Sequence, residues 1–455
     1  MSRTVQISSA LFFSLILAGI WYKAPHPALI VVLAILPLGA LFAIRYTFWL
    51  VTLFVIFSFF RIHEVVPALY SLKIPLLLSL GALAALGWHS TISRTLNVYW
   101  HPSMHWLAIF WLLVIIGVVA ASNRGVAIDY FKNMYWKVMV MTLAIMWLVT
   151  RVEDLARMSK LIALSGLLVA CVAIYNSIMG IGLVEGSRVT IGRDFGSMLG
   201  DPNDLALVLM FPFAFAISLA TTQGLSRFIR VLGVVISIAL LIAIIATQSR
   251  GGLLGVVAVS GVFAFRLIRS KTLIFSLGAV AAIVLYAAAG ISGRASGGAA
   301  EEGVDASAMG RIYAWEAAAK MAFDNPLTGV GLDNFYYNYF YYSSHWDGLN
   351  HAVHSTWFGV MAETGILGLI VFIGLIVSLI RTAKRSLNLL DKHNQAGYLV
   401  AAAIAVYAGL IGTIVSGTFL TQGFNWPIYI LAALTIAISK IAQNACQNEN
   451  TLESI

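Results

Sequence analysis

The sequence predicts an all-α membrane protein: a polytopic bundle of roughly 12–14 transmembrane helices, with one long loop that contains short helices. Sixty per cent of the residues are hydrophobic and 10% are charged, whereas about a quarter of an ordinary soluble domain is charged. Apolar runs of the ~20 residues that cross a bilayer recur throughout the chain. These observations exclude a soluble globular protein.

The apolar runs define fourteen candidate spans. They are expected at roughly 8–22, 27–44, 47–60, 72–88, 105–121, 134–150, 160–178, 203–220, 230–247, 251–268, 272–291, 356–380, 396–417 and 425–441. Several are short, so twelve true spans also fit the pattern. The first run follows Arg3 without a small-residue cleavage site before the next run, and we expect it to be retained rather than removed as a signal peptide.

Five regions follow from this pattern. They are N-terminal transmembrane helices (1–180), further transmembrane helices (181–291), a long polar loop (292–355), C-terminal transmembrane helices (356–441) and a polar tail (442–455) that we expect to be disordered. The loop carries an acidic patch at Glu301, Glu302 and Asp305. Apolar residues at helical spacing between Arg311 and Phe323 predict a helix that does not cross the membrane, and Asn325-Pro326 ends it.

Lys and Arg in short connections indicate the orientation, because they favour the cytoplasmic side. With a cytoplasmic N-terminus, that side receives Arg151, Arg157, Lys160, Arg227, Arg230, Arg266, Arg269, Lys271, Arg381, Lys384, Arg385 and Lys392. The other side receives Lys23, Arg61, Arg124, Lys132, Arg188, Arg193, Arg250, Arg294 and Arg311. The bias places both termini in the cytoplasm and gathers the unusual polar residues on the outer face. Because the net charge of +9 sits at segment ends, no nucleic-acid partner is expected.

His354 is the first candidate for chemistry, at the outer mouth of the span that begins near residue 356. An imidazole titrates near neutral pH and can accept a proton from a hydroxyl group. His351 precedes it, and Glu363 follows at membrane depth, where a carboxylate needs a partner. Glu363 could orient His354 or pair with an arginine. The spacing fits both a catalytic base and an interfacial histidine at a helix start.

Arg250 is the second candidate, in the connection Thr247-Gln-Ser-Arg250-Gly-Gly252 between two apolar runs. An arginine this close to hydrocarbon needs a partner or a wet cavity, and guanidinium matches phosphate oxygens. The neighbouring glycines would let a phosphate approach the backbone. A turn arginine that reaches to the membrane surface is the alternative.

Arg193 and Arg188 lie in a third polar segment, ahead of Asp201-Pro202-Asn203-Asp204. Pro202 fits a first helical turn with Asp201 as its cap. Alternatively, the arginines and the helix N-terminus attract an anion. Two carboxylates without a third ligand give little support for a metal.

Arg311 and the tyrosines between residues 336 and 342 complete the set. The tyrosines fit an interfacial belt or a groove that stacks on sugar rings. The chain has no phosphate loop, no outer Asp-x-Asp, no Cys/His cluster and no Gly-x-Ser-x-Gly. An ATP-driven pump or a metal-dependent glycosyltransferase is therefore poorly supported.

Residues 185–375 resemble the O-antigen ligase / O-antigen polymerase superfamily. The similarity rests on five motifs: Gly200-Asp-Pro-Asn-Asp204, Ser249-Arg-Gly-Gly252, Arg311-x3-Trp315, Asn325-Pro-Leu-x-Gly329-x-Gly331 and His354-Ser-x9-Gly365-x2-Gly368. The last motif is the most specific. The first half of the chain carries no comparable signature.

The resemblance implies an inverting, metal-independent glycosyltransferase of the bacterial inner membrane, with its active site facing the periplasm and no cofactor. The implied donor is a glycan on undecaprenyl diphosphate, and the implied acceptor is a sugar hydroxyl of lipid A–core. By this resemblance His354 is the base, and Arg193, Arg250 and Arg311 bind the diphosphate, with Arg188 competing with Arg193 for the match. The acidic Asp201 and the neighbouring Asn203 would support the site.

Other functions fit parts of the pattern. Within the superfamily, a polymerase or a protein O-glycosylation ligase would use the same donor, and the acceptor cannot be read from these residues. A polysaccharide transporter would also be polytopic, but its charges are expected at the membrane midplane, whereas these gather at one face. We therefore expect a ligase.

Overall fold

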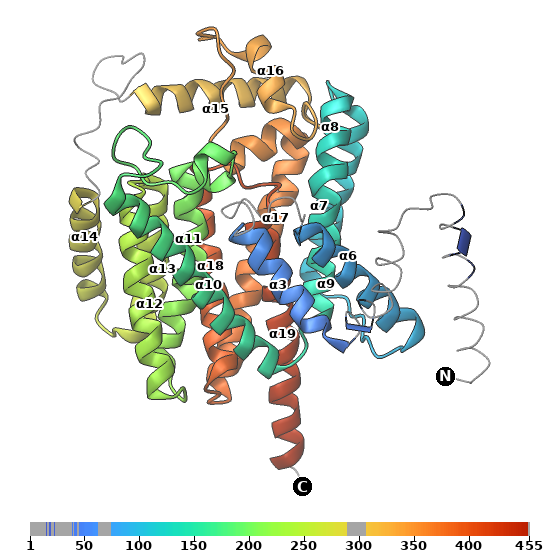
Figure 1. Ribbon diagram of the computed structural model, residues 1–455, viewed down its shortest axis with the longest axis vertical. Helices are drawn as coiled ribbons and strands as arrows, with labels where there is room; N and C mark the ends of the chain where they lie inside the picture. The colour runs from blue at the N-terminus through green and yellow to red at the C-terminus, as the bar shows by residue number, and fades with distance from the viewer. Residues whose placement is uncertain are drawn as a thin grey trace.

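A computed structural model of the protein describes residues 45–61, 74–288 and 306–453, with a few isolated positions before residue 45. All regular elements in these residues are helices (Figure 1). Nine of the described helices are long and apolar enough to cross a membrane. The predicted all-α polytopic membrane fold is therefore confirmed. The spans expected at 8–22 and 27–44, and the acidic patch of the long loop, lie outside the described ranges.

The helices before the third polar segment make up one half of the bundle. They are α3 (Thr47–Phe59), α6 (Ile74–Gly87), α7 (Pro102–Ala120), α8 (Arg124–Tyr130), α9 (Trp136–Leu148) and α10 (Val152–Met179), with π-helical turns at Trp88–Ile92 and Phe131–Tyr135.

The remaining elements start with two short 3-10 turns, η3 (Arg193–Phe195) and η4 (Met198–Gly200). They continue with α11 (Pro202–Thr221), α12 (Arg227–Ala246), α13 (Arg250–Leu267), α14 (Lys271–Ala288), α15 (Ala306–Asp324), α16 (Phe335–Tyr342), α17 (Thr356–Lys392), α18 (Tyr398–Gly417) and α19 (Trp426–Glu453).

Each of the twelve expected spans that falls in the described ranges corresponds to a helix, but three of these helices are short. Helices α3 and α9 have 13 residues each, and α14 has 18, of which 15 form its apolar stretch. Helix α9 continues α8 and a π-helical turn, so the chain is helical from Arg124 to Leu148. The expected count of 12–14 full-length spans is therefore not reached by the described residues.

Several helices extend beyond the apolar run that predicted them. Helix α10 has 28 residues and α17 has 37, and α19 runs to Glu453. The expectation of a disordered tail was therefore wrong. These extensions carry charged residues, because a helix satisfies its own backbone hydrogen bonds whether or not lipid surrounds it.

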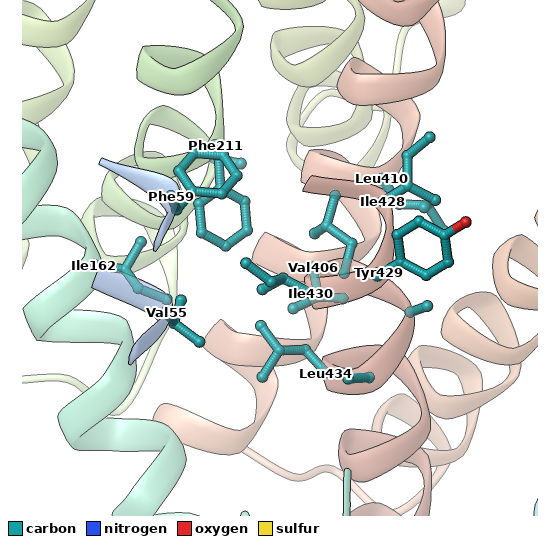
Figure 2. Close-up of a cluster of buried hydrophobic side chains, with 14 of the residues drawn as sticks. Val55, Phe59, Ile162, Phe211, Val406, Leu410, Ile428, Tyr429, Ile430 and Leu434 are labelled. Atoms are coloured by element: carbon teal, nitrogen blue, oxygen red, sulfur yellow. The ribbon is translucent and has the colours of Figure 1, made fainter. Parts of the chain in front are cut away.

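The core joins helices that are distant in the sequence. Figure 2 shows Val55 and Phe59 of α3 facing Ile162 of α10 and Phe211 of α11, next to side chains of α18 and α19. The ring centroids of Phe59 and Phe211 lie 4.5 Å apart. Close packing of this kind holds helices together inside a membrane, where lipid is as apolar as the side chains. Most of α11, α18 and α19 is buried, whereas less than a third of α12 is buried.

Helix α15 lies across one end of the bundle, with α16 beside it and the C-terminus at the opposite end (Figure 1). It is not one of the candidate spans, so the helix expected at 311–323 is confirmed as one that does not cross the membrane. Helices α11, α13 and α17 begin at this same end, which we call the α15 end. The candidate residues therefore gather where three buried helices start.

Candidate active site at the α15 end

The N-termini of α11 and α13 lie side by side and share one asparagine. Asp201 caps α11 by accepting from the backbone N–H groups of Asn203 and Asp204 at 2.7 and 3.2 Å. Ser249 caps α13 and donates through Oγ to Asn203 Oδ1 at 2.9 Å. The predicted Asp201 cap is confirmed. Two adjacent helix N-termini carry partial positive charge, which favours an anion at this position.

Arg188 and Arg193 have different environments. Arg188 is buried; its Nη2 donates to Asn203 Oδ1 at 2.9 Å and its Nε donates to the Thr247 carbonyl at 3.2 Å. Arg193 is exposed, with Nη1 donating to the Gly200 carbonyl at 3.2 Å. Arg188 therefore ties its loop to α11 and to the α12–α13 connection, whereas Arg193 presents its guanidinium at the surface.

Arg250 is the first residue of α13 and is partly exposed. The next two glycines pack against neighbouring helices. A Cβ atom on Gly252 would lie 2.5 Å from Cβ of Ala206, and one on Gly251 would lie 3.4 Å from Cβ of Phe419. We had expected both glycines to admit a phosphate; close helix packing explains Gly252, whereas Gly251 has room for a Cβ atom. Arg250 itself lies at the helix N-terminus.

His354 has an unusual backbone conformation that its neighbours hold in place. Its φ is +45°, in the left-handed region that a non-glycine residue seldom adopts. On one side, the Val353 carbonyl accepts a hydrogen bond from Trp315 Nε1 at 3.0 Å. On the other side, Thr356 Oγ1 donates to the Leu420 carbonyl at 2.7 Å. Backbone strain that the surroundings maintain in this way is common at functional sites.

The surroundings of His354 lower the pKa of its imidazole. Burial is the largest cause, followed by the positive charge of Arg311; Asp201 acts in the opposite direction, and His351 contributes a further lowering. These interactions bring His354, Arg311 and Asp201 into one site. A lowered pKa leaves the imidazole neutral at neutral pH, as a proton acceptor requires.

The Arg311-x3-Trp315 motif is explained by helix geometry, since residues four apart lie on the same face of α15. The Trp315 indole stacks on Phe358 of α17 with ring centroids 5.1 Å apart and planes at 6°. The same indole holds the Val353 carbonyl. Trp315 therefore fixes the segment that carries His354, next to the arginine that tunes its pKa.

His351 is engaged within the long loop. Its Nε2 lies 2.9 Å from an oxygen of Asp347, and its ring meets Tyr339 edge to face, with centroids 5.4 Å apart. Hydrogen bonding from His351 is the main reason that the pKa of Asp347 is lowered. His351 thus connects α16 to the loop and reaches His354 through charge.

Glu363 supports the 325–334 loop, which packs against α17. Glu363 Oε2 accepts from the Asp333 backbone N–H at 2.9 Å, and Val330 N–H donates to the Ala362 carbonyl at 2.8 Å. From the sequence, Glu363 could orient His354 or pair with an arginine. In the structure it instead accepts a hydrogen bond from a backbone N–H. The loop fits because α17 is broken at Gly365, whose φ is +74°.

Two residues of the site make contacts that the sequence does not reveal. Gln422, which is buried, donates through Nε2 to Asp204 Oδ1 at 3.2 Å and through its backbone N–H to Thr356 Oγ1 at 3.0 Å. It therefore joins the starts of α11 and α17. Trp315 was part of a motif, but its indole hydrogen bond depends on a partner 38 residues away. Neither contact has a local pattern that would reveal it.

The tyrosines of the loop do not form one surface. Tyr339 is buried, whereas Tyr336, Tyr337 and Tyr341 are exposed. No group of three or more His, Cys, Asp or Glu side chains that could hold a metal ion occurs in the part of the chain that the structure describes.

Residues 234–373 match the family model described as O-antigen ligase. This segment, about a third of the chain, is therefore similar to O-antigen ligase domains. The matched segment includes Arg250, Arg311, His354 and Glu363. It ends before residues 418–425, the connection between α18 and α19 that contains Gln422 and that we call the Gln422 loop. The expected superfamily is confirmed. A search of curated proteins found no match.

The match supports a general type of activity. Members of the family are glycosyltransferase-like enzymes of O-antigen biosynthesis, of ligase or polymerase type. The apolar helices and this match together support a multi-pass membrane protein. The residues that precede the domain, Arg188, Arg193, Asp201 and Asn203, meet it at the α15 end.

Proposed function

We propose that the protein is an O-antigen ligase, which transfers a glycan from undecaprenyl diphosphate to a sugar hydroxyl of lipid A–core and so completes lipopolysaccharide. The observation that carries the proposal is the position of His354. Burial and the positive charge of Arg311 lower the pKa of its imidazole. The site thus combines a neutral base with positive charge, and transfer from a diphosphate requires both.

The reaction follows from these two features. His354 accepts the proton of the acceptor hydroxyl as its oxygen attacks the anomeric carbon of the first sugar. The bond between that carbon and the diphosphate oxygen breaks, and the bonding electrons leave with the diphosphate. Attack from the side opposite the leaving group inverts the configuration. Because diphosphate is a good leaving group, a base and positive charge suffice for a metal-independent reaction.

The four arginines would have two different roles, binding of the diphosphate and support of the site. We assign diphosphate binding to Arg193, Arg250 and Arg311, whose charge stabilises the leaving group. Buried Arg188 holds the loop of Arg193 in place through Asn203. Asp201 lies close enough to His354 to raise its pKa, so it would stabilise the imidazolium formed by proton transfer.

The site would face the periplasm from the inner membrane. The other end of the bundle carries Arg266 near the end of α13, which pairs with Asp391 of α17, and the basic residues in the second half of α17. That end is the cytoplasmic one under the positive-inside rule. A lipid-linked donor would then lie in the membrane, with its diphosphate at the level of the α11 and α13 N-termini.

An in vitro transfer assay tests the proposal. The full-length protein in detergent is supplied with lipid-linked glycan and lipid A–core in the presence of EDTA. We expect product from the wild type, and a loss of about 10²-fold or more in the rate for His354→Ala. His393→Ala is the control, because His393 lies at the far end of α17 and should leave the rate unchanged.

The results separate the alternatives. Full activity of His354→Ala would remove the base from the mechanism, and a product that disappears with EDTA would remove the metal-independent reaction. If the wild type does not modify lipid A–core, a second lipid-linked glycan is supplied, and then a protein with Ser and Thr residues. Transfer to these acceptors would identify a polymerase or a protein O-glycosylation ligase, respectively.

A further inference from the structure

An open pocket of about 690 Å³ lies between α15 and α16, outside the membrane-spanning helices. This volume is in the range of small-molecule sites, roughly 300–1,000 Å³. Lys320 and Asp324 of α15 line it, together with Asn338 and Tyr341 of α16. None of these four residues belongs to the candidate active site.

The charged groups of the pocket are balanced by their neighbours. Lys320 Nζ lies 2.7 Å from Glu316 Oε1 and also donates to Ser344 Oγ. Asp324 is hydrogen-bonded to the Tyr342 side chain. A pocket with paired charges of both signs is poorly suited to a phosphate, which prefers a cluster of free cations or a helix N-terminus.

The remaining groups suit an uncharged polar ligand. Asn338 donates through Nδ2 to Ser122 Oγ and to the Asn334 carbonyl, both at 2.8 Å, which fixes its amide and leaves Oδ1 as an acceptor. The Tyr341 side chain is 76% exposed, so its ring can meet a ligand. An aromatic face is electron-rich and attracts C–H groups. Hydroxyl groups on one edge and C–H groups on a face are characteristic of sugar rings.

Helix α16 connects this pocket to the active site. Tyr339 packs against His351, three residues before His354, whereas Tyr341 lines the pocket. On α15, Arg311 and Lys320 are separated by about 14 Å along the helix axis. A ligand in the pocket would therefore lie several sugar residues from the reacting bond.

We propose that the pocket between α15 and α16 is an oligosaccharide subsite that binds sugars remote from the bond that forms. The proposal rests on the proposed glycan transfer for its choice of ligand. The sugars could belong to the donor glycan or to the core of the acceptor, and their recognition would use the same stacking and hydrogen bonds.

Two free sugars test the subsite by equilibrium binding to the full-length protein in detergent. One is the O-glycan released from its lipid carrier, and the other is the core oligosaccharide released from lipopolysaccharide by mild acid. Neither carries the lipid or the diphosphate. We expect one of them to bind, and Tyr341→Ala to weaken that binding about threefold to tenfold. Tyr337→Ala is the matched control, since Tyr337 is exposed on the same helix and does not line the pocket.

Binding of the O-glycan would assign the pocket to the donor, and binding of the core would assign it to the acceptor. Absence of binding by both sugars, or an equal loss in the two tyrosine variants, would overturn the proposal. The transfer assay is independent of this measurement. Transfer without Tyr341-dependent binding would refute only the subsite, and binding without transfer would refute only the ligase.

Discussion

Replacement of Gly365 by alanine should destabilise the protein more than most single substitutions. Gly365 breaks α17 with φ of +74°, a conformation that L-residues rarely adopt. A Cβ atom at this position would lie 2.5 Å from the Pro326 carbonyl oxygen and 2.7 Å from its carbon. Both are backbone atoms, so the clash cannot be relieved by rotating a side chain. The 325–334 loop or α17 must move.

The cost has two parts. Holding alanine at φ +74° and ψ −176°, a region that is essentially limited to glycine, costs about 1–3 kcal/mol. Displacing the loop weakens the hydrogen bonds from Val330 N–H to the Ala362 carbonyl and from Leu367 N–H to the Pro326 carbonyl, which are 2.8 and 3.2 Å long. Each contributes about 1 kcal/mol. Together these give a loss of about 3–5 kcal/mol in the free energy of unfolding.

Gly261→Ala is the matched control. Gly261 lies in membrane-spanning α13 and has no atom within 4 Å of an added Cβ, so alanine should leave the stability unchanged or raise it by up to about 1 kcal/mol. The free energy of unfolding of both variants is measured in one detergent by denaturant titration with tryptophan fluorescence. If Gly365→Ala and Gly261→Ala differ by less than about 1 kcal/mol, the docking of the loop on the helix break does not carry the stability that we assign to it.

Three further predictions concern the charges of the site. Arg311→Gln removes a cation that lowers the pKa of His354, so the acid limb of the pH–rate profile should move to higher pH; an unchanged limb would contradict this role. Asp201→Asn keeps the helix cap and removes a charge that raises the same pKa, so the limb should move to lower pH, whereas Asp201→Ala should also lose about 1 kcal/mol of stability. Arg188→Gln should lower the free energy of unfolding by about 3 kcal/mol. Arg193→Gln should leave the free energy of unfolding unchanged and lower the transfer rate about tenfold or more. Equal losses of stability in the two variants would refute the assignment of a structural role to Arg188 and a binding role to Arg193.

The fold could be predicted from hydropathy, but helix ends could not. Polarity marks where lipid ends, and a helix continues past that point when its charged residues face water. Helix α10 begins at Val152, ahead of two acidic residues in its first turn, although its apolar run begins near residue 160. Helix α17 likewise continues to Lys392 through the basic residues that we had placed in a loop.

The site could be predicted as a set of residues more readily than as a set of roles. The motifs around Arg250, Arg311 and His354 marked segments that the structure brings to one end. The difference between Arg188 and Arg193 depends on burial, and two arginines in one loop look alike in a sequence. The sequence showed that Glu363 lies at membrane depth. Its hydrogen-bond partner, however, is a backbone N–H 30 residues away, and no side-chain pattern encodes such a contact.

The hydrogen bonds around Asn334 limit how far the matched domain can be treated as a module. Asn334 accepts from the Asn123 backbone N–H at 2.9 Å and donates to the Asn123 carbonyl at 3.2 Å, and Ser122 N–H donates to the Val330 carbonyl at 2.9 Å. Residues 234–373 thus depend on the start of α8 as well as on the Gln422 loop. Exchanging that segment with the one from another protein that matches the same family model would cut across these contacts. A chimera intended to change acceptor choice should therefore carry residues 122–123 and 418–425 along with the domain.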